Sequence, residues 1–206
     1  LIPCVDDRPV MPLLDVLQQQ FPQLKLRLEL ADRVAGLRHE SVDVALRYGS
    51  AHDPSMVVLP IAQVPRVICA SPAYLQRMGT PSSALELSAH NALLYHIDDR
   101  PYDRWQFQTE QGLITVNVSG NRMSNDADLV RRWCVAGHGI ALKSMLDMAA
   151  DLKHGHVVAL THLTPSPPLQ LSLVCASRHQ ISAPVQQLRT LLQQHVEHDL
   201  RLASIR

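Results

Sequence analysis

Two segments of similar sequence, VPRVICAS at 64–71 and LQLSLVCAS at 169–177, constrain the fold of this chain more than any other feature. Each is an apolar run typical of a buried strand, and each lies where the character of the chain changes. Two such crossings let the residues between them form a lobe, while the residues before and after complete another lobe. The pattern predicts two lobes joined by two crossover strands; one continuous sheet with a coincidental repeat is the alternative.

Helical and strand periodicities alternate in the first part of the chain. Apolar residues recur at three- and four-residue steps from Pro9 to Phe21, which predicts a helix. LKLRLEL at 24–30 alternates apolar and charged residues, which predicts a strand with one buried face, and VDVALRYG at 42–49 predicts a second strand. A helix over 32–41 would return the chain to a neighbouring parallel strand. This order predicts an α/β fold with a parallel sheet.

The rest of the chain continues the same alternation. Prolines divide the apolar run at 57–71 into two strand pieces. Further strands are expected at 92–97, 104–109, 112–120, 139–144, 157–160 and 169–177, and helices at 126–137, 145–155 and 183–202. The predicted fold is α/β, with two Rossmann-like lobes joined by two crossover strands. We assign residues 1–70 and 166–206 to lobe I and residues 71–165 to lobe II.

Composition excludes several classes of partner. Nineteen Lys and Arg balance nineteen Asp and Glu, so the chain lacks the excess of basic charge with which proteins usually bind nucleic acid. No apolar run is long enough for a membrane helix, and the amino end lacks the pattern of a signal peptide, which predicts a cytoplasmic protein. Four cysteines are far apart and are interpreted as reduced thiols: Cys4, Cys69, Cys134 and Cys175. The initial Leu suggests a fragment of a longer protein.

Motifs of catalysis and of metal binding are missing from the sequence. It contains no GxSxG, GxxxxGK[ST] or GxGxxG, and Gly137-His138-Gly139 opens a strand, so we expect it to end the preceding helix. Eleven histidines include the pairs His154/His156 and His195/His198, but neither fits a zinc motif. The sequence therefore predicts no enzyme, no metal and no cofactor. A small hydrolase or transferase would need a nucleophile and a base that it does not display.

Polar residues at the carboxyl ends of the predicted strands are the candidate ligand site. Ligands of open parallel sheets bind at these ends, where helix amino termini present free N–H groups. Four places qualify: Cys4 to Arg8 with Asp7 between them, Ala31-Asp32, Arg47-Tyr48, and Ser124-Asn125. The first three come from one lobe and the last from the other. Ordinary helix capping or surface ion pairs are the alternative interpretation of each.

Three stretches, in their order and spacing, resemble the effector-binding domain of bacterial LysR-type transcriptional regulators: FPQLKLRLEL-ADR-VAGLRHESVDVALRYG, VPRVICASPAYLQRMGTP and AGHGIAL. The resemblance covers nearly the whole chain. It implies a fold similar to type 2 periplasmic binding proteins and a small metabolite in the cleft between the lobes. It also implies self-association to a dimer or tetramer that holds promoter DNA. In that family an amino-terminal winged helix-turn-helix, which would precede Leu1, contacts the DNA.

Two departures from the family pattern bear on the ligand. Many members have Ser or Thr where this chain has Cys4-Val-Asp-Asp-Arg, and a hydrophobic residue and Pro where it has Lys143-Ser144. An anionic ligand would meet Asp6 and Asp7 unless Arg8, Arg47 or Lys143 outweighs them. We therefore add Lys143 to the candidate ligand-binding residues and expect a small polar anion or zwitterion.

Two further expectations follow from the resemblance. A periplasmic solute-binding protein has the same fold and is the main alternative, although four unpaired cysteines argue against it. In the family, one lobe's helix packs against the other lobe of a neighbour. The apolar helix from Pro9 to Phe21 is therefore expected to contribute to self-association, unless it packs only on its own sheet.

Overall fold

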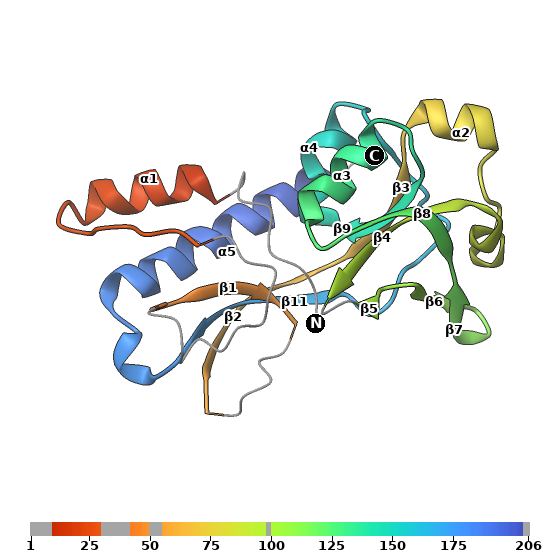
Figure 1. Cartoon of the computed structure of the whole chain (residues 1–206). Coiled ribbons are helices and arrows are strands. Elements are labelled where there is room, and N and C mark those ends of the chain that lie inside the picture. The colour runs from red at the N-terminus through yellow and green to blue at the C-terminus, as the bar shows by residue number, and fades with distance from the viewer. Residues whose placement is uncertain (1–9, 30–41, 50–54, 98–99, 204–206) are drawn as a thin grey trace. The chain divides into compact units, whose positions relative to one another are not determined.

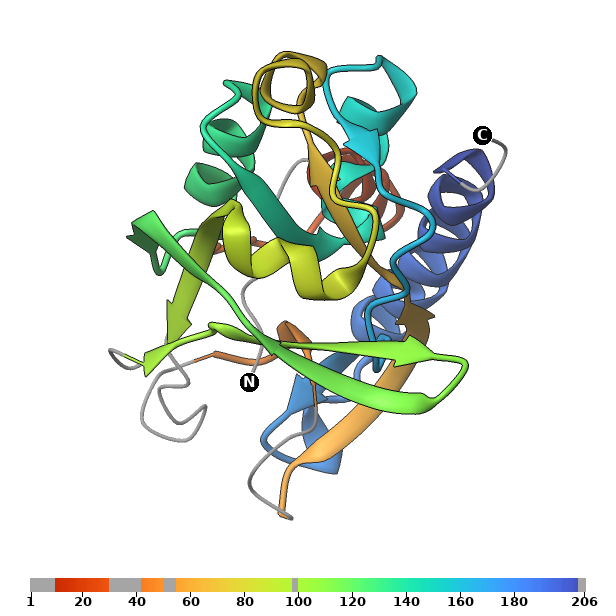
Figure 2. The ribbon, with the colours of Figure 1, turned by 90° about the vertical axis from the view of Figure 1, so that its right-hand side faces the viewer.

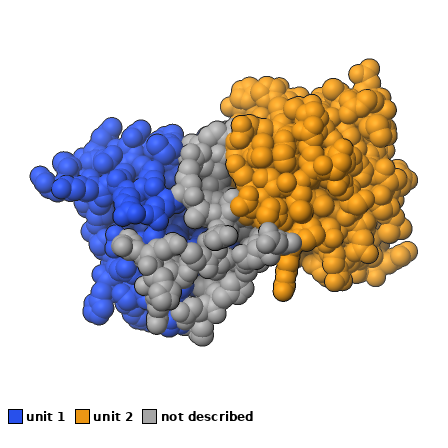
Figure 3. Space-filling model, viewed as in Figure 1, with its two compact units in different colours: residues 1–63, 170–199 blue, residues 64–169, 200–206 orange. Residues whose placement is uncertain are grey.

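A computed structural model describes residues 10–29, 42–49, 55–97 and 100–203 (Figure 1). The chain divides into two compact units, which Figure 3 colours separately. Unit 1 comprises Leu1–Gln63 and Gln170–Asp199, and unit 2 comprises Val64–Leu169 and Leu200–Arg206. Among the described residues, no helix is long and apolar enough to span a membrane.

Unit 1 contains a three-stranded sheet in the order β1–β11–β2. The strands are β1 (Ala45–Tyr48), β11 (Leu169–Cys175) and β2 (Val57–Val64). β1 runs antiparallel to β11, with Tyr48 opposite Leu171. Except for the half-buried Gln170, every residue of β11 is buried, which agrees with the nearly continuous apolar run that predicted this strand.

Two helices of the chain confirm the predictions from apolar spacing. Helix α1 spans Met11–Gln20, has a proline in its first turn, and buries Leu14 and Leu17. Helix α5 spans Ala183–Ala203 and buries Val185, Leu192 and Val196, which share one face. The short helix η2 (Arg178–Gln180) precedes α5.

The strand predicted at 24–30 is wrong for the part of it that the structure describes. Residues 24–29 form no strand, and the side chains of Leu26 and Leu28 are 36% and 53% exposed. Alternation of apolar and charged residues marks a possible strand face, but a strand also needs a ladder partner. No described strand pairs with this segment, so the expected parallel neighbour of 42–49 is not found. The helix predicted over 32–41 lies outside the described residues.

Unit 2 is built on a mixed six-stranded sheet. Five strands follow the order β10 (Val158–Ala159), β3 (Arg66–Ala70), β9 (Ile140–Ser144), β4 (Asn91–Ile97) and β5 (Arg100–Pro101), and β8 (Ser119–Ser124) also pairs with β4. β4 runs parallel to both β8 and β9, whereas β3 is antiparallel to β9. As predicted, Pro65 separates β2 from β3.

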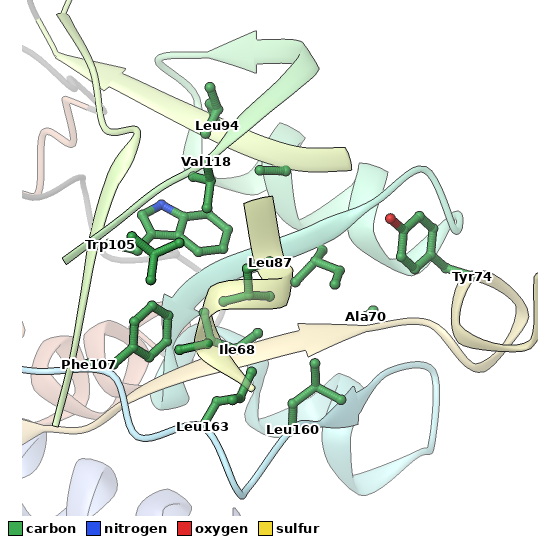
Figure 4. Close-up of a cluster of buried hydrophobic side chains, with 14 residues drawn as sticks. Ile68, Ala70, Tyr74, Leu87, Leu94, Trp105, Phe107, Val118, Leu160 and Leu163 are labelled. Carbon is green, nitrogen blue, oxygen red and sulfur yellow. The ribbon is translucent and has the colours of Figure 1, made fainter. Parts of the chain in front are cut away.

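Both faces of this sheet are covered. On one face lie the short helix η1 (Ala84–Ala89) and the hairpin of β6 (Arg104–Thr109) and β7 (Gly112–Asn117), on the near side in Figure 2. Their apolar side chains form the cluster of Figure 4, which includes Leu87, Trp105 and Phe107. On the other face, α3 (Ala127–Val135) and α4 (Met145–Lys153) bury Val130, Cys134 and Met148. Helix α2 (Pro72–Met78) follows β3.

Glycines allow the parallel strands of unit 2 to approach closely. A Cβ atom at Gly120 of β8 would lie 1.7 Å from the carbonyl oxygen of Ala92 on β4, and one at Gly139 would lie 2.4 Å from that of Asn91. Gly137 has a φ of 79° just after α3 and ends that helix, as the sequence predicted. Gly137 and Gly139 thus turn the chain from α3 into β9.

Candidate functional site

The carboxyl ends of three parallel strands meet at one edge of the unit 2 sheet. β8 ends at Ser124 and is followed by α3, and β9 ends at Ser144 and is followed by α4. Figure 1 shows α3 lying over β9 and β4. The edge therefore presents the amino termini of two helices, whose first N–H groups have no partner within the helix and favour anions.

Ser124 and Asn125 lie at this edge, as predicted. The Ser124 hydroxyl is buried and accepts a hydrogen bond from the Asp126 N–H at 3.0 Å. The Asp126 carboxylate caps α3 by accepting hydrogen bonds from the N–H groups of Asp128 at 2.8 Å and Leu129 at 3.1 Å. Ser124 therefore contributes to the cap, whereas the exposed Asn125 makes no hydrogen bond with its side chain to any described residue.

Lys143 carries a charge that the protein already balances. Its side chain is buried, and its Nζ lies 3.2 Å from the Asp147 carboxylate and donates to the Ala127 carbonyl at 3.0 Å. Ala127 is the first residue of α3 and Asp147 lies in the first turn of α4. Lys143 thus ties the amino termini of the two helices together, which positions them without offering a free cation.

Arg66, at the start of β3, is a buried cation that the sequence interpretation missed. The residue is 7% exposed. Its Nη1 donates to the Tyr102 hydroxyl at 2.6 Å, and its Nη2 donates to the Ser166 carbonyl. No described carboxylate pairs with it, and its Nε has no hydrogen-bond partner among the described residues. The available signal was an arginine at the start of an otherwise apolar strand.

In unit 1, the predicted residues Arg47 and Tyr48 end β1. Tyr48 is buried, and Arg47 is half-buried and lies directly opposite Ser172 of β11. Opposed residues of an antiparallel pair project from the same face, so the side chains of Arg47 and Ser172 leave the sheet on one side. The Ser172 Oγ is fully buried and has no hydrogen-bond partner among the described residues. This pair offers donors from a cation and a hydroxyl to a polar ligand.

Four predicted ligand-binding residues, Cys4, Asp7, Arg8 and Asp32, lie outside the described residues. The structure therefore relates only Arg47 to Tyr48, in unit 1, and Ser124 and Asn125 to Lys143, in unit 2. Arg47 and Tyr48 share the end of β1, whereas Ser124 with Asn125 and Lys143 lie at the ends of β8 and β9, which both pair with β4.

The described thiols are free, as predicted, and chemically protected. Cys69, Cys134 and Cys175 are fully buried, and the sulfur atoms of Cys69 and Cys134 lie 3.9 Å apart. The hydrogen bond with Cys134, together with burial, raises the pKa of Cys69 well above its usual value. Burial likewise raises the pKa of Cys175. A nucleophile needs a thiolate, so these thiols are poor candidates for catalysis.

The histidine pairs give no metal site within the described chain. No three His, Cys, Asp or Glu side chains of the described residues are grouped so that they could hold a metal ion. His154 and His156 stack with ring centroids 5.7 Å apart, and the His156 Nδ1 lies 3.1 Å from the Asp151 carboxylate. Asp151 also pairs with Arg131 at 2.7 Å. These contacts link α3 with α4 and the loop after it.

Comparison with known proteins places the chain in a family. The family model of the LysR substrate binding domain matches residues 1–197. The HTH-type transcriptional regulator DmlR of Escherichia coli (strain K12) is 35% identical over 149 residues, which cover 72% of this chain and 48% of that protein. The HTH-type transcriptional activator TtdR of Escherichia coli (strain UTI89 / UPEC) is 31% identical over 149 residues, with the same two coverages. The chain thus spans about half the length of these curated relatives.

Solved structures show the same fold. The regulatory domain of CrgA from Neisseria meningitidis has a TM-score of 0.79 at 22% identity, covering 91% of both chains. The full-length Vibrio cholerae virulence activator AphB has a TM-score of 0.74 at 22% identity, covering 89% of this chain and 62% of that one. These similarities confirm the predicted α/β fold of the type 2 periplasmic-binding-protein kind. With the family match, they show that this chain belongs to the LysR substrate-binding domains, the effector-binding domains of LysR-type transcriptional regulators.

Proposed function

We propose that this chain is the regulatory domain of a bacterial transcription factor and binds a small metabolite that controls DNA-dependent transcription. The family match and the relatives named as transcriptional regulators support this. The structural observation that carries it is the half-buried Arg47 at the end of β1, opposite Ser172 of β11, whose buried hydroxyl has no hydrogen-bond partner among the described residues. A periplasmic solute-binding protein is not favoured, because the relatives are regulators. No catalytic role is proposed.

The proposed effector-binding residues follow the strand ends chosen from the sequence. We assign the lobes, as in the sequence interpretation, to residues 1–70 with 166–206 and to residues 71–165. The effector is a small polar anion or zwitterion. The proposed ligand-binding residues are Cys4, Asp7, Arg8, Asp32, Arg47, Tyr48, Ser124, Asn125 and Lys143. Among the described members, Arg47 and Asn125 have side chains with groups available for direct contact, and Lys143 acts by positioning the two helix amino termini.

Self-association is the second part of the proposal. Helix α1 exposes Met11 and Val16, at 47% and 37%, and buries Leu14 and Leu17. We propose that these two exposed side chains contribute to a dimer or tetramer. Promoter DNA is contacted through an amino-terminal winged helix-turn-helix outside residues 1–206, and the whole protein acts in the cytoplasm. Light scattering at high protein concentration tests the contribution of α1, and an unchanged association state in M11E/V16E would refute it.

A thermal-shift screen of small acids and amino acids tests effector binding. A ligand that binds only the folded state raises the unfolding temperature by mass action. We expect at least one compound to do so, and R47A to reduce its effect. Replacement of Arg27, whose side chain is 80% exposed and lies outside the described strands, should leave the effect unchanged in R27A. A complete absence of response across the screen, or an equal response in R47A, would contradict the proposed site.

A further inference from the structure

Arg66 is a buried charge that the described protein does not neutralise. Transfer of a guanidinium from water into a protein interior is costly unless an opposite charge compensates it. The Tyr102 hydroxyl and the Ser166 carbonyl satisfy two of its N–H groups, but both partners are neutral. The Nε–H, in contrast, is buried and has no acceptor among the described residues. Arg66 therefore retains both an unused donor and an unbalanced positive charge.

Tyr102 extends the group of donors around Arg66. Its backbone N–H donates to the Tyr95 carbonyl of β4 at 2.8 Å, while its hydroxyl accepts from Arg66 on β3. The Tyr102 and Arg66 side chains thus together bridge the distance between the β4 side of the sheet and β3. Since the hydroxyl oxygen accepts from Arg66, its own proton remains available to donate, and no described group accepts it.

His96 projects from the same face of the sheet as Arg66. On β4, Ala92 and Leu94 belong to the Trp105 cluster, so alternation places His96 on that face. On β3, Arg66 precedes by two residues Ile68, which belongs to the same cluster. The His96 Nδ1 is buried and has no hydrogen-bond partner among the described residues.

We propose that Arg66, held in place by Tyr102, binds a carboxylate group of the effector. A carboxylate brings one negative charge, which balances one guanidinium, and one of its oxygens can accept from the Arg66 Nε–H. The Tyr102 hydroxyl, which accepts from Nη1, positions the guanidinium for this contact. A phosphate would carry more charge than this single cation balances. The inference rests on the proposed effector-binding function and names the chemical class of the ligand and its charged anchor, Arg66, which is not among the residues predicted from the sequence.

Matched pairs of carboxylates and amides test the charge requirement. Succinate, malonate and benzoate are compared with succinamide, malonamide and benzamide in thermal shift and calorimetry on the whole chain, with sodium phosphate and sodium chloride as ion controls. We expect at least one carboxylate to raise the unfolding temperature, and its amide and the two ion controls to have little effect. Stabilisation by an amide equal to that by its carboxylate, or by phosphate alone, would overturn the inference.

Variants assign the binding to Arg66. R66M should weaken the active carboxylate about 100-fold or more, because it removes one partner of a buried charge pair. Y102F, which keeps the ring and loses the hydroxyl, should weaken it about 3- to 10-fold. R104Q, which removes an exposed arginine of the same unit, should bind like the wild type. Y102F provides the test if R66M does not fold.

The unliganded proteins separate binding from a structural role. If Arg66 serves the ligand, R66M without ligand should unfold close to the wild-type temperature, because a buried, unbalanced charge has been removed. A large loss of stability in R66M combined with undiminished carboxylate binding would make Arg66 structural and overturn the inference. Wild-type stabilisation by amino acids or amides but by no carboxylate would reject the carboxylate anchor and retain effector binding. No response to any compound would reject both.

Discussion

Replacing Lys143 by Met should destabilise unit 2 strongly. The Lys143 and Asp147 side chains are only 6% and 3% exposed, and their charged atoms lie 3.2 Å apart. In K143M the Asp147 carboxylate loses its cation, and its Oδ1 already has no hydrogen-bond partner among the described residues. The Ala127 carbonyl also loses its lysine donor. Breaking a buried pair by removing one partner costs about 3–5 kcal/mol, which is the expected loss in the free energy of unfolding.

A double-mutant cycle isolates the pair. K143M/D147L replaces both charges by apolar side chains of similar size, and such replacements are neutral or stabilising by about 1–4 kcal/mol in other buried pairs. The double variant should therefore recover most of the stability that K143M loses. K153M replaces an exposed lysine of α4, the helix that contains Asp147, and should lower the free energy of unfolding by less than about 1 kcal/mol.

Urea unfolding, monitored by tryptophan fluorescence, measures the differences in the free energy of unfolding of unit 2. Both tryptophans of the chain, Trp105 and Trp133, belong to unit 2, so the signal reports on the unit that contains Lys143. A loss below about 1 kcal/mol in K143M, or a double variant less stable than either single variant, would refute the argument that the pair is buried and mutually compensating.

Three further predictions concern other parts of the chain. G120A should cost about 3 kcal/mol or more in urea unfolding, because its Cβ would meet the Ala92 carbonyl; G79A, whose Cβ meets nothing, should cost about 1 kcal/mol from its φ of 83°. In C4S, the three described thiols should react with Ellman's reagent only after urea is added; rapid native reaction would contradict their burial. Hydrogen bonds from Ser82 lower the pKa of Glu86, so their stabilisation should disappear as the pH falls through that lowered pKa; melting temperatures of E86Q should lack this acid-dependent step.

Much of the fold could be predicted from local sequence patterns. The strand predictions that failed have a common cause. The break between β2 and β3 follows from Pro65, and helices α1 and α5 follow from their apolar spacing. The strand predicted at 24–30 failed because alternation cannot reveal whether a ladder partner exists. β8 at Ser119–Ser124 was not predicted beyond its first two residues, because SGNRMS lacks β-branched residues and is a strand only through its pairing with β4.

Residues of the candidate site could be predicted only where they follow directly from the end of a predicted strand. Arg47, Tyr48, Ser124 and Asn125 do lie at strand ends in the structure. The partner of Lys143 could not be inferred by helical spacing, because Lys143 lies in strand β9 and Asp147 lies in the first turn of helix α4. Ser172 and Arg66 lie within apolar strands, where sequence reasoning expects core residues, so their unsatisfied polar groups became visible only in three dimensions.

Lys143 and Arg66 show why buried charge must be assessed by its partners. In the sequence, both are single cations near the end of an apolar strand, and both are 7% exposed in the structure. Lys143 meets a carboxylate on the following helix, so its charge is balanced within the fold and its removal should destabilise the protein. Among the described residues, Arg66 meets the hydroxyl and ring of Tyr102 and the Ser166 carbonyl but no carboxylate, so we propose that a ligand balances its charge. The same physical rule therefore predicts a loss of stability for the first substitution and a loss of ligand affinity for the second.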